Sequence, residues 1–240
     1  MYHYMIGSRV SPTPFSTFGL RRGALGVLPI LPAAVAFGLV YGVAAAEKGM
    51  SLLEVGLSCM LIFAGASQLV ALELWQEPLP IATMVIAVLV INLRHLLMGA
   101  TVAPWFEGVG RLRTWLSLYL MTDESWGVAV ADRRQGHADA AFLMGAGAAL
   151  WLAWLSAGLA GHGMGNLTGN IDPALFAWLI TGFFVVLLAG FWRGGGDLVP
   201  WLVAAAVALM VKALLPGTWY ILAGALAGSL LGAWLHVRRA

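Results

Sequence analysis

Long apolar runs constrain this chain more than any other feature of its sequence. A helix needs roughly 20 apolar residues to cross a hydrocarbon core about 30 Å thick. Eight such runs lie near residues 23–46, 52–75, 80–103, 111–131, 141–161, 173–192, 198–215 and 217–235. The runs are continuous rather than alternating, which favours helices over the strands of a membrane β-barrel. We therefore predict an all-α polytopic membrane protein with about eight transmembrane segments.

The charge content supports a membrane protein and excludes several other classes. Only 10% of the residues are charged and 61% are hydrophobic, whereas a soluble domain carries about 25% charged residues. So few charges cannot coat a water-facing surface, which excludes a soluble enzyme. The net charge of +2 does not indicate a nucleic-acid partner. No GxxxxGK(S/T) loop is present, so the chain binds no nucleotide through a P-loop.

The basic residues predict the orientation of the chain. With eight spans and a cytoplasmic N-terminus, the cytoplasmic side would hold Arg9, Arg21, Arg22, Arg133, Arg134, Arg193, Arg238 and Arg239. The outer side would hold Lys48, Arg111 and Arg113. This bias would reverse if 111–131 did not cross, so we expect that segment to span and both termini to be cytoplasmic. The expected parts are a cytoplasmic arm (1–22), a single transmembrane domain (23–237) and a cytoplasmic tail (238–240).

The first four runs are interrupted by proline or by polar residues. The interruptions are Pro29 and Pro32, Phe63-Ala64-Gly65-Ala66-Ser67-Gln68, Asn92-Leu93-Arg94-His95, and Thr122-Asp123-Glu124-Ser125. At about 1.5 Å per residue, Arg94 lies roughly 14 Å and Asp123 about 12 Å from the ends of their spans, close to the midplane. Ser67 and Gln68 lie at a comparable depth. Because polar side chains at one depth would be unpaired in lipid, we expect a cavity among these spans.

The ionisable residues of this layer admit two interpretations. Each costs on the order of 2.5–3.5 kcal/mol to insert into a membrane and therefore needs a partner or a role. Arg94 could form an internal ion pair with Asp123 or Glu124 that holds the helices together. Alternatively, one of the two carboxylates could carry a proton. Adjacent helical positions point about 100° apart, so only one of the two is expected to face the cavity.

The histidines carry weaker signals. Asn92 and His95 are three residues apart and share a helix face. A lone histidine is more often a packing residue than a ligand, and no His/Cys cluster accompanies it, so we predict neither a metal site nor a cofactor. His162, within Gly161-His162-Gly163, is expected to be solvated in an outer loop.

The 63–68 segment and the two prolines also suggest broken helices. Proline removes a backbone donor, and small residues allow a local break. Discontinuous helices bind amino acids at the midplane of many secondary transporters, where half-helix N-termini face the carboxylate. Prolines in membrane helices are also often simple kinks. The residues alone leave both interpretations open, and they also leave open whether the second and third runs cross fully or re-enter. No internal repeat is evident that would predict inverted symmetry.

Three blocks in the chain resemble signature blocks of the AzlC family, the large subunits of branched-chain amino acid exporters. The blocks are Phe63-Ala64-Gly65-Ala66-Ser67-Gln68, then Asn92-Leu93-Arg94-His95-Leu96-Leu97-Met98, then Thr122-Asp123-Glu124-Ser125. The resemblance covers roughly residues 20–235 and extends to Gly26-x2-Pro29, Ala36-Phe37-Gly38 and Leu215-Pro216-Gly217. One departure is the stretch Ile30-Leu31-Pro32-Ala33-Ala34-Val35, where family members often carry a tyrosine. Substrate preference on that side of the site is therefore not carried over.

The resemblance implies a two-component secondary exporter in the bacterial cytoplasmic (inner) membrane. It implies a small AzlD-like membrane subunit as partner and the substrates leucine, isoleucine, valine and methionine. It also implies proton antiport as the driving force, and no enzymatic activity. The family name by itself does not fix the substrate, because a related large subunit could export another small amphiphile.

The polar layer and the family blocks coincide, which gives a working hypothesis for the site. The substrate carboxylate would meet Arg94 or the freed amides around Gly65–Ser67, and its ammonium group would meet Asn92 or an acidic side chain. The predicted substrate-binding residues are Gly65, Ala66, Ser67, Gln68, Asn92, Arg94 and His95. The predicted proton-coupling residues are Asp123 and Glu124, and the predicted helix breaks are Pro29 and Pro32.

Three other functions are compatible with the sequence. An intramembrane serine hydrolase would use Ser67 as nucleophile and His95 as base, and it needs a hydrogen bond between them. A non-transporting scaffold subunit would tolerate Arg94→Leu and Asn92→Leu. A passive channel would show neither saturation nor counterflow.

Overall fold

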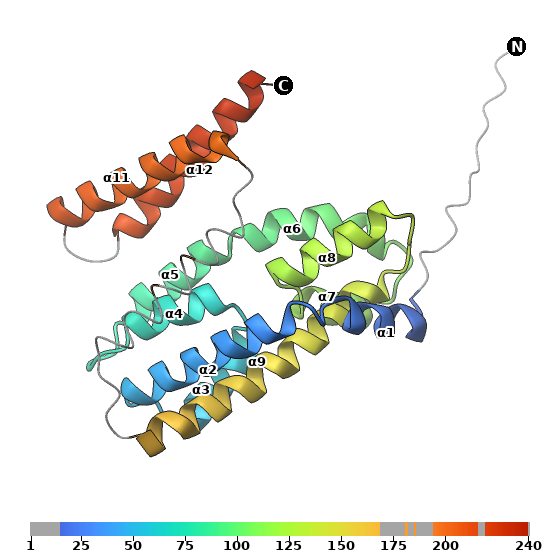
Figure 1. Ribbon diagram of the computed structural model, residues 1–240, viewed down its shortest axis with the longest axis horizontal. Coiled ribbons are helices and arrows are strands. Elements are labelled where there is room, and N and C mark those ends of the chain that lie inside the picture. The colour runs from blue at the N-terminus through green and yellow to red at the C-terminus, as the bar shows by residue number, and fades with distance from the viewer. Residues whose placement is uncertain (1–14, 169–180, 182–184, 186–193, 216–218, 240) are drawn as a thin grey trace, which may run out of the picture. The chain divides into compact units, whose positions relative to one another are not determined.

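The computed structural model describes residues 15–168, 181, 185, 194–215 and 219–239, and every element within them is helical. The prediction of an all-α fold is confirmed for these residues. The chain divides into two compact units, residues 1–171 and 172–240, which are considered separately (Figure 1). The predicted run at 173–192 lies outside the described residues, apart from residues 181 and 185.

The helices of the two units have the following bounds. The first unit contains α1 (Thr17–Gly26), α2 (Leu31–Glu47), α3 (Leu52–Leu61), α4 (Gly65–Glu73), α5 (Ile81–Asn92), α6 (Arg94–Val102), the 3-10 turn η1 (Ala103–Phe106), α7 (Arg111–Tyr119), α8 (Asp123–Arg134) and α9 (Ala141–Thr168). The second unit contains the 3-10 turn η2 (Gly195–Asp197), α11 (Leu198–Leu214) and α12 (Trp219–Arg239).

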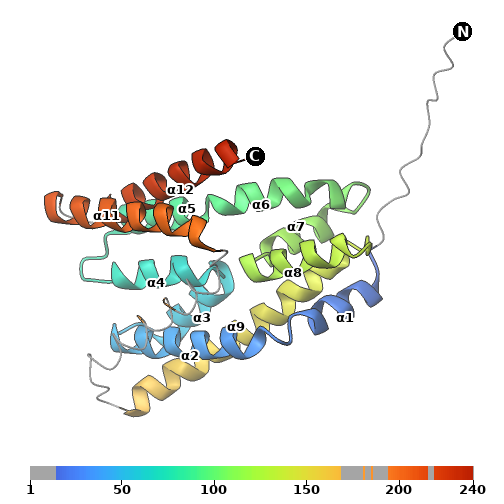
Figure 2. The same ribbon diagram turned by 45° about the horizontal axis from the view of Figure 1, so that its top comes forward.

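Helix α9 is the central element of the first unit, and α1 and α2 lie along it (Figures 1 and 2). A Cβ atom added to Gly42 would lie 2.0 Å from the carbonyl oxygen of Gly158, and one added to Gly23 would lie 2.0 Å from the carbonyl oxygen of Phe142. The glycines therefore let α1 and α2 touch the backbone of α9. Such close approach is the usual packing of membrane helices, where small residues replace a hydrophobic driving force.

Helices α1 and α2 form one bent pair. They meet at 71°, with Pro29 in the break and Pro32 in the first turn of α2. Helix α1 begins after Ser16, whose side chain accepts a hydrogen bond from the Gly19 amide. The helix thus extends into the segment that was expected to form a cytoplasmic arm.

Helices α3 and α4 form a hairpin rather than one crossing helix. The break contains Phe63, whose φ of 40° lies in the left-handed region and interrupts the helix. Ser58 Oγ accepts a hydrogen bond of 3.0 Å from Gln68 Nε2, ten residues further along the chain. Ten residues of continuous helix would separate these positions by about 15 Å. Helix α4 therefore turns back from α3, and the expectation that 52–75 crosses the membrane as one helix is wrong.

Helices α7 and α8 form a second hairpin. The Arg133 guanidinium, near the end of α8, lies 4.8 Å from the ring centroid of Trp105, which precedes α7. The amide of Ser16, before α1, donates a 3.3 Å hydrogen bond to Asp139, after α8. The segment thus enters and leaves beside the start of α1, so the expectation that 111–131 crosses is also wrong. The fold-back occurs where Thr122 caps a new helix instead of continuing the old one.

The two hairpins enter from opposite ends of the first unit. We define the Ser16 end as the end where α1 begins and the Met50 end as the end where α2 finishes. The Met50 carbonyl accepts a 2.7 Å hydrogen bond from His162 Nε2, which places the start of α3 beside the end of α9. His162 is buried within α9, so the expectation of a solvated outer-loop histidine is wrong.

The order of elements repeats with inverted direction. A bent crossing (α1–α2) and a hairpin (α3–α4) are followed by a second crossing (α5–α6) and a second hairpin (α7–α8). The first hairpin enters from the Met50 end and the second from the Ser16 end. The Tyr119 hydroxyl donates a hydrogen bond to the Met60 carbonyl, so the turning points of the two hairpins lie next to each other.

Two described helices are long and apolar enough to cross a membrane. They cover Ile81–Phe106 and Ala141–Gly165, and the α1–α2 pair adds a third if it counts as one span. The third predicted run, 80–103, therefore forms one long helical segment that is interrupted only by a turn at Leu93. In the second unit, α11 and α12 pack closely, since a Cβ atom on Gly228 would lie 2.7 Å from the Ala204 Cβ. A total of eight spans is not established by these helices.

Candidate functional site

The three family-like blocks lie where helices begin in the middle of the first unit. Helix α4 begins at Gly65, α6 at Arg94 and α8 at Asp123. Two of these starts are the turning points of hairpins, and the third is the local turn of the α5–α6 crossing. The Tyr119–Met60 contact joins the two turning points. Residues from separate parts of the sequence are thereby gathered in one region.

Gln68 is the centre of a buried hydrogen-bond network. Its Oε1 accepts a 2.9 Å hydrogen bond from Trp154 Nε1 on α9, and its Nε2 donates to Ser58 Oγ at 3.0 Å. The Tyr41 hydroxyl also bonds Ser58 Oγ, and Cys59 Sγ lies 3.6 Å from Gln68 Nε2. With 1% of Gln68 exposed, its amide is committed to protein partners. In this conformation Gln68 fastens the first hairpin to α2 and α9.

The first turn of α4 lies against two aromatic side chains. A Cβ atom on Gly65 would lie 2.8 Å from Phe37 Cε1 and 3.0 Å from Trp154 Cη2. The N-cap residue, Ala64, makes no side-chain hydrogen bond to this turn. The amides of Gly65, Ala66 and Ser67 belong to the group of first-turn donors that a helix cannot satisfy internally. Such donors, at the positive end of the helix dipole, favour an anion.

Ser67 connects the first hairpin to the α5–α6 crossing. Its Oγ donates a 3.0 Å hydrogen bond to Asn92 Oδ1, at the end of α5. Ser67 is fully buried, whereas Asn92 is half-buried. The serine hydroxyl is thus directed to an amide and not to His95. A hydrolase would need a serine–histidine hydrogen bond, and among the described residues Ser67 has none.

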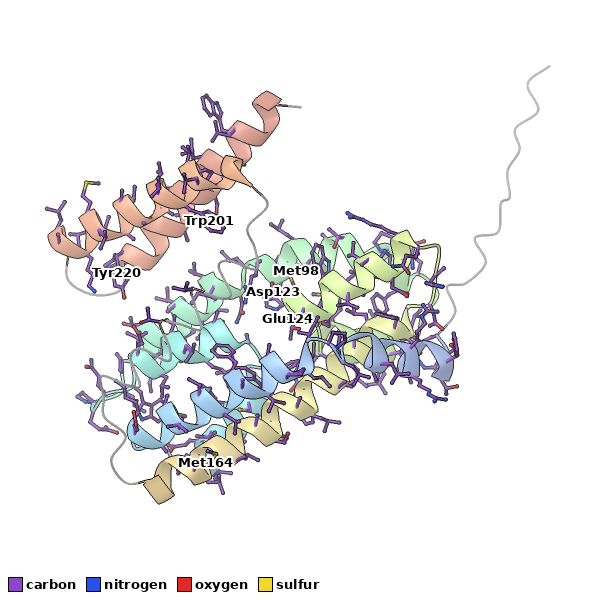
Figure 3. The ribbon with its side chains drawn as sticks, in the orientation of Figure 1. Met98, Asp123, Glu124, Met164, Trp201 and Tyr220 are labelled. Atoms are coloured by element: carbon purple, nitrogen blue, oxygen red, sulfur yellow. The ribbon has the colours of Figure 1, made fainter. Side chains whose placement is uncertain are left out.

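Arg94 and Asp123 form an ion pair between α6 and α8. Arg94 Nη1 lies 2.7 Å from Asp123 Oδ2, and the two side chains are 40% and 29% exposed. Figure 3 shows Asp123 and Glu124 where α8 begins. Glu124 is exposed, and the ion pair of Arg94 is with Asp123 instead, as expected if only one of two adjacent helical positions, about 100° apart, faces Arg94. Of the two candidate carboxylates, Asp123 is therefore the one that meets Arg94.

The environment of this pair is sparsely charged. Asp123 and Glu124 lie in the first turn of α8, where acidic side chains complement the helix dipole. Within the described part of the chain, the buried Nε of Arg94 and the buried Nδ1 of His95 have no hydrogen-bond partner. The guanidinium of Arg94 thus retains hydrogen-bonding capacity beyond Asp123.

The remaining predicted residues lie elsewhere. Pro29 and Pro32 are exposed at the α1–α2 break and contribute no polar group to the site. They shape the crossing helix instead, because proline cannot donate a backbone hydrogen bond.

Sequence reasoning missed the partners of Gln68. Tyr41 and Trp154 stack at 5.9 Å between ring centroids, and Phe37 packs edge-on against Trp154 at 5.1 Å. One signal was available: Trp154 lies in the interior of its predicted span, far from the interfaces where tryptophan usually anchors. A buried indole needs an acceptor for its N–H group.

Comparisons with known proteins identify the family of the chain. The model of the AzlC protein family matches residues 29–168, which include α2 to α9. An uncharacterized membrane protein of Archaeoglobus fulgidus is 30% identical over 221 residues, covering 89% of this chain and 94% of the relative. The inner membrane protein YgaZ of Escherichia coli K12 is 27% identical over 193 residues, covering 76% of this chain and 79% of the relative. No solved structure matches the chain. Since the family model covers more than half of the chain, including all three blocks, this protein belongs to the AzlC family of membrane proteins.

Proposed function

We propose that this chain is the large subunit of a secondary exporter of branched-chain amino acids and methionine. One observation carries the proposal: the three family-like blocks meet where α4, α6 and α8 begin, linked by Ser67–Asn92 and Arg94–Asp123. Broken helices that meet inside a membrane protein are the usual amino-acid site of secondary transporters. The partner would be a small AzlD-like membrane subunit, and proton antiport would drive export.

The site contains groups that can bind each part of an amino acid. The amides of Gly65–Ser67 and the guanidinium of Arg94 are candidate receptors for the carboxylate. Asn92 and Asp123 are candidate receptors for the ammonium group. A branched aliphatic side chain needs only apolar surroundings, which Phe37 and Trp154 begin to supply next to α4.

The charge distribution supports a cytoplasmic Ser16 end. In the described part of the first unit that end holds Arg21, Arg22, Arg111, Arg113, Arg133 and Arg134, whereas the Met50 end holds Lys48. Because both 52–75 and 111–131 fold back, two crossings are lost and the bias becomes stronger instead of reversing. Arginine on the inner side is the ordinary rule for inner-membrane proteins, which supports a cytoplasmic N-terminus.

Leucine efflux from cells loaded with a leucine-containing dipeptide tests this function. The cells would express this chain alone, this chain with an AzlD-like partner, or the Arg94→Leu variant with the partner. Arg134→Leu, an exposed arginine at the end of α8, is the matched control. We expect saturable efflux that requires both chains, collapses with the proton gradient, fails in Arg94→Leu and survives in Arg134→Leu.

The other outcomes separate the competing functions. Normal efflux in Arg94→Leu, or an intact complex that transports none of the four amino acids, would contradict the exporter and favour a scaffold subunit. Efflux without saturation or counterflow would favour a passive channel.

A further inference from the structure

The Arg94–Asp123 ion pair has the properties of a ligand-binding site rather than of a permanent structural contact. The two side chains are partly exposed, and within the part of the chain that the structure describes, the Nε of Arg94 has no hydrogen-bond partner. The pair joins the α5–α6 crossing to the second hairpin, so separating the two charges frees the start of α8. This inference rests on the proposed function and concerns how that site recognises its substrate.

When Arg94 and Asp123 separate, each loses its oppositely charged partner. An α-amino acid carries one negative and one positive charge that can replace these partners. Its carboxylate matches the planar guanidinium of Arg94, as Asp123 does now. Its ammonium group can bind the carboxylate that Arg94 releases. Exchange of one internal ion pair for two charge-assisted contacts keeps the site neutral, which matters because unpaired charge within a membrane is costly.

We propose that the substrate zwitterion inserts between Arg94 and Asp123, with its carboxylate on Arg94 and its ammonium group on Asp123. Asp123 is then both the ammonium receptor and the proton carrier. A proton that binds the Asp123 carboxylate removes the partner of the ammonium group and expels the substrate. Proton and amino acid thus compete for one carboxylate, which is the relation that antiport requires.

Few other charged groups face this pair. His95 follows Arg94 on α6, and Glu124 follows Asp123 on α8. The helices α5 and α9, which pack against α6 and α8 respectively, contain no Asp, Glu, Lys or Arg in their described residues. At the far end of α7, the Arg113 guanidinium lies over the Phe15 ring. The pH dependence of binding is therefore assigned to Asp123.

Two leucine analogues, each lacking one charge, test the proposal on the purified complex. Isocaproate keeps the carboxylate without the ammonium group, and isopentylamine keeps the ammonium group without the carboxylate. Binding of leucine and of both analogues would be measured across pH for wild type, Arg94→Gln, Asp123→Asn and Glu124→Gln, with Arg134→Leu, at an exposed position at the end of α8, as the control.

We expect each analogue to depend on one residue. Asp123→Asn should weaken the binding of leucine and isopentylamine by at least about tenfold without weakening that of isocaproate. Arg94→Gln should weaken the binding of leucine and isocaproate to a similar extent without weakening that of isopentylamine. Wild-type leucine binding should weaken as the pH falls, and this dependence should vanish in Asp123→Asn. The Arg134→Leu control should retain both the affinity and the pH dependence of wild type, and so should Glu124→Gln if Asp123 is the carboxylate involved.

The outcomes distinguish this proposal from the proposed function. Leucine binding that is equal in all variants, or an Asp123→Asn variant that retains the pH dependence, would overturn the inserted zwitterion while leaving an exporter. A Glu124→Gln variant that behaves as expected of Asp123→Asn would overturn the assignment to Asp123. Absence of leucine binding by the wild-type complex at every pH would overturn the substrate and this inference together.

Discussion

At the scale of single residues, polar side chains in this protein fall into two groups. Gln68, Ser67 and Trp154 are buried and hydrogen-bonded: the Trp154 indole donates to Gln68, and Ser67 donates to Asn92. Arg94 and Asp123 are partly exposed and paired by charge. Removing any member of the first group lowers the stability of the fold, because its former partners stay buried without hydrogen bonds. The second group can exchange partners.

The Gln68→Leu substitution tests the structural group. It removes the acceptor of the Trp154 N–H and the donor to Ser58, so we expect a loss of about 1–3 kcal/mol in stability for each unsatisfied buried group. The melting temperature of the purified protein in detergent measures this loss. Gln135→Leu, at an exposed position after α8, should leave the melting temperature unchanged. Equal values for both variants would show that the network does not hold the hairpin.

At the scale of helices, glycine decides which elements lie in contact. The α2–α9 contact depends on Gly42, where a side chain would meet the Gly158 carbonyl, and the α1–α9 contact depends on Gly23. Gly127 in α8 has no atom within 4 Å of its Cβ position. Two helical glycines of the same chain therefore have opposite roles: one is required for packing, and the other is only a poor helix former.

The pair Gly42→Ala and Gly127→Ala tests this distinction. In Gly42→Ala the two helices must separate, so we expect a lower melting temperature and a smaller yield of folded protein. In Gly127→Ala we expect equal or greater stability, by up to roughly 1 kcal/mol from helix propensity. A Gly42→Ala variant as stable as wild type would contradict the backbone contact between α2 and α9.

At the scale of the whole molecule, the first unit consists of crossings and hairpins with inverted direction. A crossing followed by a hairpin occurs twice, and the two hairpins meet at Tyr119 and Met60. In secondary transporters such inverted repeats place the substrate site at the midplane between the two halves. This position coincides with Arg94 and Asp123.

Cysteine accessibility distinguishes this topology from eight crossings. In a Cys59→Ser background, single cysteines would replace Lys48, Gln76 or Glu107, which are all exposed. With the Ser16 end in the cytoplasm, a membrane-impermeant maleimide added to intact cells should label positions 48 and 76 but not 107. Eight crossings would instead expose 48 and 107 and protect 76. Labelling at 107 in intact cells would contradict the first hairpin, because position 107 faces the outside only if 52–75 crosses.

The sequence by itself determined the class of the protein and the places where its helices are interrupted. Continuous apolar runs can be satisfied only by helices in a membrane, and proline or polar residues mark breaks because they cannot continue an apolar helix at low cost. The blocks around Ser67, Arg94 and Asp123 were therefore located correctly as polar interruptions. Membership of the AzlC family was also readable from these blocks and agrees with the family comparison.

Tertiary structure alone decided which segments cross and which residues meet. A crossing helix and a hairpin of two half-helices have the same length and apolar content, so neither the runs nor the charge count could separate them. The difference depends on contacts distant in sequence, such as Trp154 with Gln68 and Arg133 with Trp105. Likewise, the sequence could not show which of Asp123 and Glu124 faces the site, because the two carboxylates are adjacent in the chain. Only the direction in which α8 begins brings Asp123 to Arg94.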